Sequence, residues 1–220
     1  MEYGYGNWLT VLVSIILSLF FIKAAFKPRT KTDWRTYRLF GAFIVALFTE
    51  MFGFPLTIYL LTSLFGNRLN IDLSHNSGHL LEDFLGLKSD PHFSLLHIIS
   101  NLLIAGGLIL IATAWNVLYK SQKENKLAIT GAYHYIRHPQ YAGFILIIIG
   151  FLLQWPTLIT LIMAPILMWR YFRLGKEEEK AVFKRFINEY AIYKSRTPAY
   201  IPSLKMLSAV IWKKSNPTKT

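Results

Sequence analysis

The chain has 220 residues, of which 53% are hydrophobic and only 16% are charged, whereas a soluble domain of this length would carry about 25% charged residues. The absence of cysteine excludes disulfide bonds, thiolate metal sites and cysteine nucleophiles. The net charge of +12 is better explained by the basic residues that fix membrane topology than by nucleic-acid binding, so we expect an integral membrane protein without a nucleic-acid partner.

Five apolar segments predict an all-α, multi-span helical bundle. In chain order they are Trp8 to Phe26, Leu39 to Phe65, Leu95 to Tyr119, Tyr141 to Leu153 and Thr157 to Phe172. The first is too long for the core of a signal peptide. The last two are each shorter than the roughly 20 residues that cross a bilayer, so we interpret them as a short helical hairpin.

The distribution of lysine and arginine predicts the orientation of these spans. The segment Lys27 to Arg38 holds five basic residues and one acid, and the segment Lys120 to Arg137 holds four basic residues and one acid. The segment Gly66 to Ser94 has two basic residues and four acids. Because basic loops stay in the cytoplasm, we expect the N-terminus outside and the C-terminus in the cytoplasm.

The segment after the fifth span begins with a run of charges from Arg173 to Lys180. Apolar residues then recur at near-helical spacing up to Tyr193, which predicts a cytoplasmic amphipathic C-terminal helix at the membrane surface. From composition alone, a solvated helix face with a weak i,i+4 ion pair is the favoured interpretation of the charges.

The run from Gly131 to Gly143 is the most informative part of the sequence, because it places rings, an arginine and a proline between two apolar segments. Pro139 can open the fourth span at its first turn, where unpaired backbone N–H groups can receive an anionic group. His138 and Tyr141 stand beside these donors. For other rings of the run, such as Tyr133, anchoring at the membrane interface is an alternative.

Polar residues in and near the loop that is predicted to lie outside, and within the second apolar segment, are less informative. His75, His79, His92 and His97 have no recognisable metal-binding motif around them, so we predict no metal site. Glu50 lies inside the second apolar segment, where a carboxylate must face a partner or a cavity. It either lines a substrate cleft or makes a buried structural hydrogen bond, and the sequence leaves both open.

Three motifs taken together resemble the integral-membrane isoprenylcysteine carboxyl methyltransferases. They are the pattern G-x-Y-x-x-x-R-H-P-x-Y-x-G at residues 131–143, the pattern W-R-x-F-R at 169–173 and the glutamates 177–179. The resemblance covers roughly residues 115 to 202. Membrane phospholipid N-methyltransferases are similar in the same region, and sterol reductases also carry an R-H-P-x-Y segment.

The resemblance implies S-adenosyl-L-methionine as methyl donor, bound beneath the loop before the fourth span and capped by the tail. By position, the residues that it implies for cofactor binding are Asn125, Lys126, Leu127, Ala128, Tyr133, His138, Pro139, Gln140, Tyr141, Glu177 and Glu178. The last two are alternatives. The family commonly has an arginine four residues before its key glutamate, and from Arg173 this spacing selects Glu177. It also has a phenylalanine eight residues after that glutamate, and from Phe186 this spacing selects Glu178.

The acceptor is expected to be lipophilic, because apolar spans would admit it from the bilayer. Arg170 and Arg173 lie beside the glutamates and are the predicted catalytic residues, since an arginine can position a carboxylate with two hydrogen bonds. Carboxyl O-methylation is therefore favoured over N-methylation of a phospholipid headgroup, and the resemblance implies an isoprenylcysteine-like or other lipid-linked carboxylate as acceptor. An NADPH-dependent sterol-type reductase and a non-catalytic membrane adaptor are the alternatives of other classes.

Three parts of the chain are expected to differ in role. Residues 1–114 would form the N-terminal spans that line substrate access, residues 115–202 the methyltransferase core, and residues 203–220 a basic C-terminal tail. Membrane lipids are expected partners. The sequence does not define the oligomeric state, because the pair Gly106 and Gly107 would permit close helix contact within one chain or between two.

Overall fold

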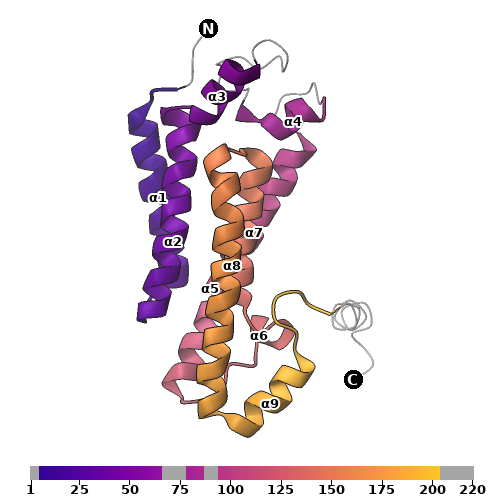
Figure 1. The fold of residues 1–220 in the computed structure, drawn as a ribbon. Coiled ribbons are helices and arrows are strands. Elements are labelled where there is room, and N and C mark those ends of the chain that lie inside the picture. Colours follow the sequence, from indigo (N-terminus) through magenta and orange to yellow (C-terminus); the bar gives the residue numbers. More distant parts are fainter. Residues whose placement is uncertain (1–4, 66–77, 87–93, 204–220) are drawn as a thin grey trace, which may run out of the picture.

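A computed structural model describes residues 5–65, 78–86 and 94–203, and the only regular structure in these ranges is helical (Figure 1). The predicted all-α bundle is therefore confirmed. The elements are α1 (Trp8–Phe26), α2 (Lys31–Phe48), the π-helix η1 (Thr49–Gly53), α3 (Leu56–Phe65), α4 (Leu80–Phe84), α5 (Leu95–Lys123), α6 (Ala132–Tyr135), α7 (Pro139–Gln154), α8 (Leu158–Arg185) and α9 (Ile187–Arg196).

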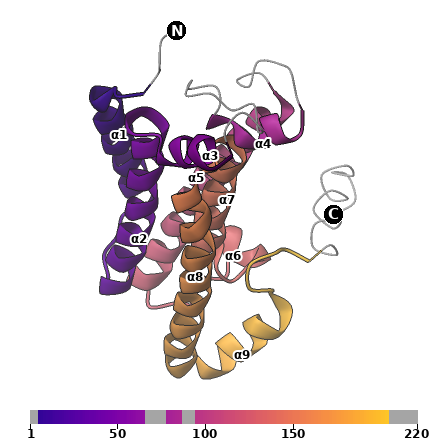
Figure 2. The same cartoon turned by 45° about the horizontal axis from the view of Figure 1, so that its top comes forward.

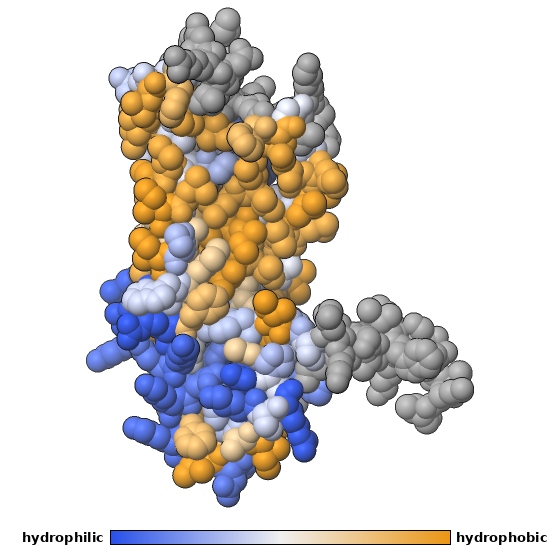
Figure 3. Space-filling model, turned by 45° about the vertical axis from the view of Figure 1, so that its right-hand side comes forward, coloured by the Kyte–Doolittle hydropathy of each residue, from blue (hydrophilic) through white to orange (hydrophobic). Residues whose placement is uncertain are grey.

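The long helices have the dimensions of membrane spans. Among the described residues, α1, α5 and α8 are long and apolar enough to cross a membrane, and α2 with η1 and α3 forms a fourth candidate that is bent by 62°. The apolar helix α7 has 16 residues. Apolar side chains form a continuous band over the face shown in Figure 3, above a hydrophilic end. These features support a multi-pass membrane protein.

The second span begins earlier than predicted and is bent in its middle, although it ends at Phe65 as predicted. α2 begins at Lys31 rather than Leu39, because the Thr30 hydroxyl and the Asp33 carboxylate form a reciprocal capping box that starts the helix within polar sequence. The chain then turns through η1 before α3. Glu50 lies in this bend and is buried, and its Oε2 accepts hydrogen bonds from Thr57 N at 2.9 Å and Thr57 Oγ1 at 2.6 Å. Glu50 thus makes a buried structural hydrogen bond, which is one of the two roles that the sequence leaves open.

The fifth span continues further than the apolar pattern predicts. The sequence indicates an end at Phe172, whereas α8 runs to Arg185 without interruption. The charged residues 176–180 are lysine and glutamate, which are strong helix formers, so the helix leaves the apolar band without breaking. The predicted tail helix is consequently divided between the end of α8 and α9, with the break at Phe186.

The core of the bundle lies between α2, α5, α7 and α8. Phe144 on α7 is fully buried, and its ring centroid lies 5.1 Å from that of Phe40 on α2 and 5.6 Å from that of Tyr171 on α8. Gly107 and Gly143 let α5 and α7 approach closely, because a Cβ on Gly143 would lie 2.8 Å from the Gly107 carbonyl oxygen. The core thus includes residues on both sides of the predicted boundary at 114, and the division into parts stays a prediction.

Both views of the ribbon place the α1–α2 turn, the α5–α7 connection and α9 toward one end of the bundle, which we call the polar end (Figures 1 and 2). α3 and α4 lie at the opposite end. The predicted co-location of the His138 segment and the C-terminal helix is therefore confirmed. His75, His92 and nearly all of the predicted basic tail lie outside the described residues, while the rings of His79 and His97 are 5.8 Å apart at the opposite end.

Candidate active site

A cavity of about 360 Å³ opens at the polar end, between the start of α2, the end of α5, the connection to α7, and the helices α8 and α9. Its walls contain three carboxylates, several basic side chains and a group of aromatic rings. The lining residues are Thr30, Thr32, Asp33, Leu118, Gln122, Asn125, Lys126, Leu127, Ala128, Tyr133, Arg137, His138, Gln140, Glu178, Glu179, Ala181, Val182, Arg185, Phe186, Tyr190 and Tyr193.

One wall is the turn that follows α5. Asn125 adopts a left-handed conformation with φ of 56°, which asparagine tolerates better than most residues. Its side-chain oxygen accepts a hydrogen bond from Arg185 at the end of α8, so the turn is tied to the opposite wall. Lys126 N donates to Ser121 O at 2.9 Å and keeps the turn folded back on α5.

The His138 segment is held by the last described part of the chain. Arg137 N donates to Pro198 O at 2.9 Å, and His138 N donates to Ala199 O at 3.0 Å. Pro139 then occupies the first turn of α7, as predicted. Residues 197–200 thus form a strap that fixes the segment from outside, and the Tyr200 ring stacks on the His138 ring with centroids 5.1 Å apart.

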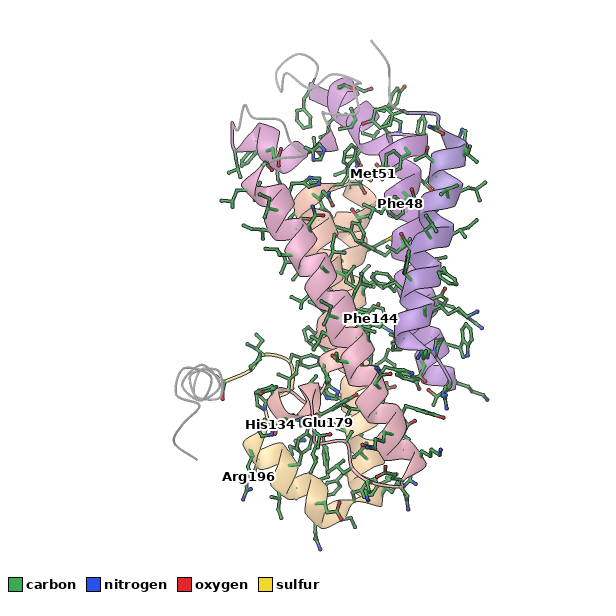
Figure 4. The ribbon with its side chains drawn as sticks, turned by 180° about the vertical axis from the view of Figure 1, so that it is seen from behind. Phe48, Met51, His134, Phe144, Glu179 and Arg196 are labelled. Carbon is green, nitrogen blue, oxygen red and sulfur yellow. The ribbon has the colours of Figure 1, made fainter. Side chains whose placement is uncertain are left out.

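Glu179 gathers three side chains around one carboxylate. Its Oε1 lies 2.8 Å from Arg137 Nη2 and 3.0 Å from His138 Nε2, and its Oε2 lies 2.9 Å from Lys194 Nζ. Burial lowers the pKa of His138 below its ordinary value, and Glu179 only partly offsets this effect. His138 is therefore neutral near pH 7, with its Nε2–H donated to Glu179. Figure 4 shows Glu179 at the polar end, far from Phe48 and Met51.

Glu178 presents a second carboxylate to the cavity. Tyr141, which is buried, donates its hydroxyl to Glu178 Oε1 at 2.6 Å, and Glu178 Oε2 lies 4.0 Å from His138 Nδ1. The Glu178 side chain keeps 30% of its surface exposed. It therefore has one oxygen fixed by the protein and one available to a ligand.

Aromatic rings form another part of the cavity wall. The Tyr133 hydroxyl donates to Gln140 Oε1, and Tyr193 donates its hydroxyl to Tyr133 O at 2.6 Å, which joins α9 to α6. The rings of Tyr190 and Tyr193 lie 6.1 Å apart. The cavity thus combines flat apolar surfaces with charges of both signs, which suits a ligand that is itself part aromatic and part zwitterionic.

The structure brings together most of the residues predicted for cofactor binding. Asn125, Lys126, Leu127, Ala128, Tyr133, His138, Gln140 and Glu178 line this one cavity. Pro139, Tyr141 and Glu177 do not line it, although Tyr141 supports Glu178 and Pro139 starts α7. Of the two alternative glutamates, Glu178 faces the cavity and Glu177 is exposed.

The predicted catalytic arginines are not among the residues that line the cavity. The guanidinium carbons of Arg170 and Arg173 lie 5.8 Å and 5.2 Å from the centroid of the Trp169 ring. Arg173 is exposed and Arg170 is half-buried. Their catalytic role stays a prediction.

Several lining residues were not identified from the sequence. Glu179 and Arg137 lie within the motifs that were noted, but only the structure shows that they pair with each other. In the sequence Asp33 is a single acid among five basic residues, whereas in the structure it caps α2 and lines the cavity. Arg185 carried no signal, because a single basic residue at a helix end is common.

Comparison with known proteins agrees with this geometry. Residues 94–183 match the model of the isoprenylcysteine carboxyl methyltransferase (ICMT) family. This part of the chain is therefore similar to that family. The match begins at the N-cap of α5 and ends in α8, so it includes the α5–α6 turn, the His138 segment and both cavity glutamates.

Curated relatives carry corresponding names. The chain is 29% identical over 126 residues to protein-S-isoprenylcysteine O-methyltransferase B of Arabidopsis thaliana, which covers 54% of this chain and 64% of that protein. It is 28% identical over 87 residues to the Schizosaccharomyces pombe protein-S-isoprenylcysteine O-methyltransferase, covering 39% of this chain and 37% of that protein. The mouse (Mus musculus) protein of that name is 32% identical over 94 residues, covering 41% and 33%. The chain thus spans less than two thirds of the length of these relatives, and every helix before α5 lies outside the family match.

Proposed function

We propose that the protein is an integral-membrane methyltransferase that uses S-adenosyl-L-methionine to methylate the carboxylate of an isoprenylcysteine-like, lipid-linked acceptor. The observation that carries the proposal is the convergence of Asn125–Ala128, His138 and Glu178 on one cavity at the polar end of a membrane bundle. The ICMT family match covers the same elements.

The cavity fits the chemistry of this donor. Small-molecule sites commonly enclose about 300–1,000 Å³, and this cavity lies within that range. Glu178 and Asp33 can bind a positively charged group of the donor, and Lys126 and Arg185 can bind its carboxylate. The Tyr190 ring offers a flat surface. When bound, the donor supplies an activated methyl group on a cationic sulfur, so no metal is needed to activate it.

The protein's own contribution is alignment and exclusion of water. α9 and the strap 197–200 cover the His138 segment, and the Glu179 cluster holds them in place. Tyr141 fixes the rotamer of Glu178 from the core side. Binding both reactants in a fixed geometry removes much of the entropic barrier to a bimolecular displacement.

The acceptor carboxylate needs no strong general base, because it is already an anion near pH 7. Arg170 and Arg173 lie where α8 leaves the apolar band, so they can hold an acid group whose lipid tail remains among the spans. The names of the relatives support this choice of acceptor. An amine headgroup would instead require a base, for which Glu178 is the best-placed residue.

Binding of S-adenosylhomocysteine to the detergent-solubilised protein, measured by calorimetry, tests the donor site. We expect binding by the wild type, and a more than tenfold weaker affinity for His138→Ala and for Glu178→Ala. Glu177→Ala is the matched control and should keep wild-type affinity, because its side chain lies outside the cavity. Wild-type affinity in both cavity variants would refute the site. A spectroscopic titration with NADPH should show no binding, which separates this function from a reductase.

Transfer of a labelled methyl group tests the acceptor. We expect product with a farnesylcysteine analogue and none with phosphatidylethanolamine, and Arg173→Gln should raise the KM for the analogue without changing donor affinity. Product with the amine lipid alone would establish the N-methyltransferase alternative. An unchanged KM would remove Arg173 from the acceptor site.

The proposed orientation places the cavity in the cytoplasm. Because the chain has no cysteine, single cysteines report their own location. Lys184→Cys at the end of α8 should resist a membrane-impermeant thiol reagent in intact cells, whereas Phe84→Cys, 87% exposed in the wild type, should be labelled. The opposite labelling pattern would invert the topology.

A further inference from the structure

We infer that the α1–α2 turn is a binding site for the headgroup of an anionic glycerophospholipid, distinct from the methyl-donor cavity. The inference stands independently of the proposed function, because it concerns residues 20–42, which lie outside the ICMT family match.

A hollow of about 660 Å³ lies along the first turns of α2. Four of its seven lining side chains are cationic, and the lining residues are Arg29, Lys31, Trp34, Arg35, Arg38, Leu39 and Ala42. Lys31, Arg35 and Arg38 are spaced at helical intervals and therefore share one face of α2. All four cations are exposed.

These cations lack partners of opposite charge. No ion pair joins them to a carboxylate within residues 5–65, 78–86 and 94–203. The acid nearest in sequence, Asp33, is buried and accepts hydrogen bonds from Arg29 N and Thr30 N. The positive charge of the hollow is thus left for an external anion.

The N-terminus of α2 adds to the positive potential of this hollow. Residues in the first turn of a helix are favourable when acidic, because the N-terminus of the helix carries partial positive charge. Asp33 meets that preference within the capping box of α2, whereas Lys31 and Arg35 oppose it. An anion bound at this end of α2 would relieve the repulsion and would be attracted by the same dipole.

A second hollow of about 470 Å³ shares Arg29 with the first and extends toward the apolar band. It is lined by Phe20, Ala24 and Pro28 as well as Lys23, Lys27 and Arg29. Phe20 is 62% exposed, and the exposed side chains of Ile16 and Leu17 continue this apolar surface along α1. A ligand that uses both hollows must therefore join an acidic group to an apolar chain, as a phospholipid does.

Two aromatic contacts hold the turn in shape. Arg29 stacks over the Tyr119 ring on α5 with its guanidinium carbon 3.7 Å from the centroid, and Lys23 Nζ lies 5.9 Å from the centroid of Trp34. Tryptophan and tyrosine favour the headgroup depth of a bilayer. Clusters of four or more basic residues at this depth are typical of anionic-lipid recognition.

Thermal unfolding of the full chain in a zwitterionic detergent tests the inference. Dioctanoyl phosphatidylglycerol at about ten times its Kd should raise the Tm by about 3 °C or more. Dioctanoyl phosphatidylcholine and inorganic phosphate, which lack either the net charge or the apolar chains, should raise it by less than about 1 °C. Equal shifts with the two lipids, or an equal shift with phosphate, would overturn the inference.

Variants distinguish lipid binding in the two hollows from general electrostatic attraction between the lipid and a basic surface. Arg35→Gln with Arg38→Gln should remove most of the shift caused by phosphatidylglycerol. Lys120→Gln with Lys123→Gln removes the same charge at the end of α5 and should retain the shift. Ala42→Trp fills the first hollow while keeping every cation, and it should also reduce the shift. If the control pair loses as much as the α2 pair, or if Ala42→Trp responds like the wild type, the site does not exist.

Discussion

The hairpins α1–α2 and α7–α8 are built from similarly apolar sequence, but they play different parts in the bundle. α1 buries three of its 19 residues, Val11, Ile22 and Phe26, whereas α7 buries eight of its 16. α7 packs against α5 through glycines, and α8 carries the cavity glutamates beyond the apolar band. α7, although shorter than α1, is therefore the structural centre of the bundle, whereas α1 mainly faces lipid.

The polar ends of these hairpins show the same contrast. At the α7–α8 end, charges of opposite sign meet within hydrogen-bond distance, as in the cluster of Arg137, His138 and Lys194 around Glu179. At the α1–α2 end, the exposed cations of the first hollow make no ion pair with a carboxylate in the described part of the chain, and the acid Asp33 is buried in the helix cap. Paired charges can shape a site for a zwitterionic ligand, whereas unpaired charges can only attract an anion. The same residue types thus serve different purposes according to their partners.

The largest expected effect comes from a matched pair of phenylalanines, one in each hairpin. Phe144→Ala removes a fully buried ring of α7 and should destabilise the protein by about 3 kcal/mol, lowering the Tm by about 6–12 °C. Phe21→Ala removes a ring of α1 that is 59% exposed and should change stability by less than about 0.5 kcal/mol. Thermal unfolding in one detergent measures both. Similar losses in the two variants would show that α1 is as tightly packed as α7.

A smaller effect is expected at the cluster around Glu179. Glu179→Ala leaves the Arg137 side chain, which is 12% exposed, without its carboxylate and should cost about 2 kcal/mol. Donor affinity should fall with it, because His138 loses its hydrogen-bond acceptor. Glu177→Ala, two positions before Glu179 and outside the cavity, is the control and should not change stability. A neutral Glu179→Ala would mean that the strap and α9 are held by their backbone contacts alone.

The smallest effect concerns pH. Burial lowers the pKa of His138 in the folded state, so the unfolded chain binds a proton more readily than the folded one. This difference destabilises the fold as the pH falls below the ordinary histidine pKa of about 6.5, and it has no effect above neutrality. The Tm of the wild type should consequently fall more between pH 7 and pH 5.5 than the Tm of His138→Gln. Parallel curves would show that His138 keeps an ordinary pKa.

Hydropathy and motif spacing predicted much of this arrangement, and the reasons for the failures are physical. The start and end of α1 were predicted because strongly apolar sequence defines both. The start of α2 and the end of α8 were not, because capping and the helix preference of lysine and glutamate extend these helices into polar sequence. A hydropathy pattern measures transfer into lipid, and it does not register a helix that continues in water.

The candidate site shows a similar limit. Residues within one motif, such as His138 and Gln140, were identified together because their spacing is local. Asp33 and Arg185 reach the cavity from helices that are distant in sequence, and only the packing of α2 and α8 brings them there. Spacing also does not show which face of α8 meets the cavity, so it leaves Glu177 and Glu178 as alternatives, of which Glu178 lines the cavity.

Hydrogen exchange measured by mass spectrometry, with and without S-adenosylhomocysteine, tests most directly whether one donor molecule bridges the α5–α6 turn and the α8–α9 junction. We expect slower exchange in residues 124–138 and in residues 178–196 at the same ligand concentration, with no change in α1 or α3. Protection of only one of these two segments, or of neither in a sample that binds the ligand, would contradict a donor site at this cavity.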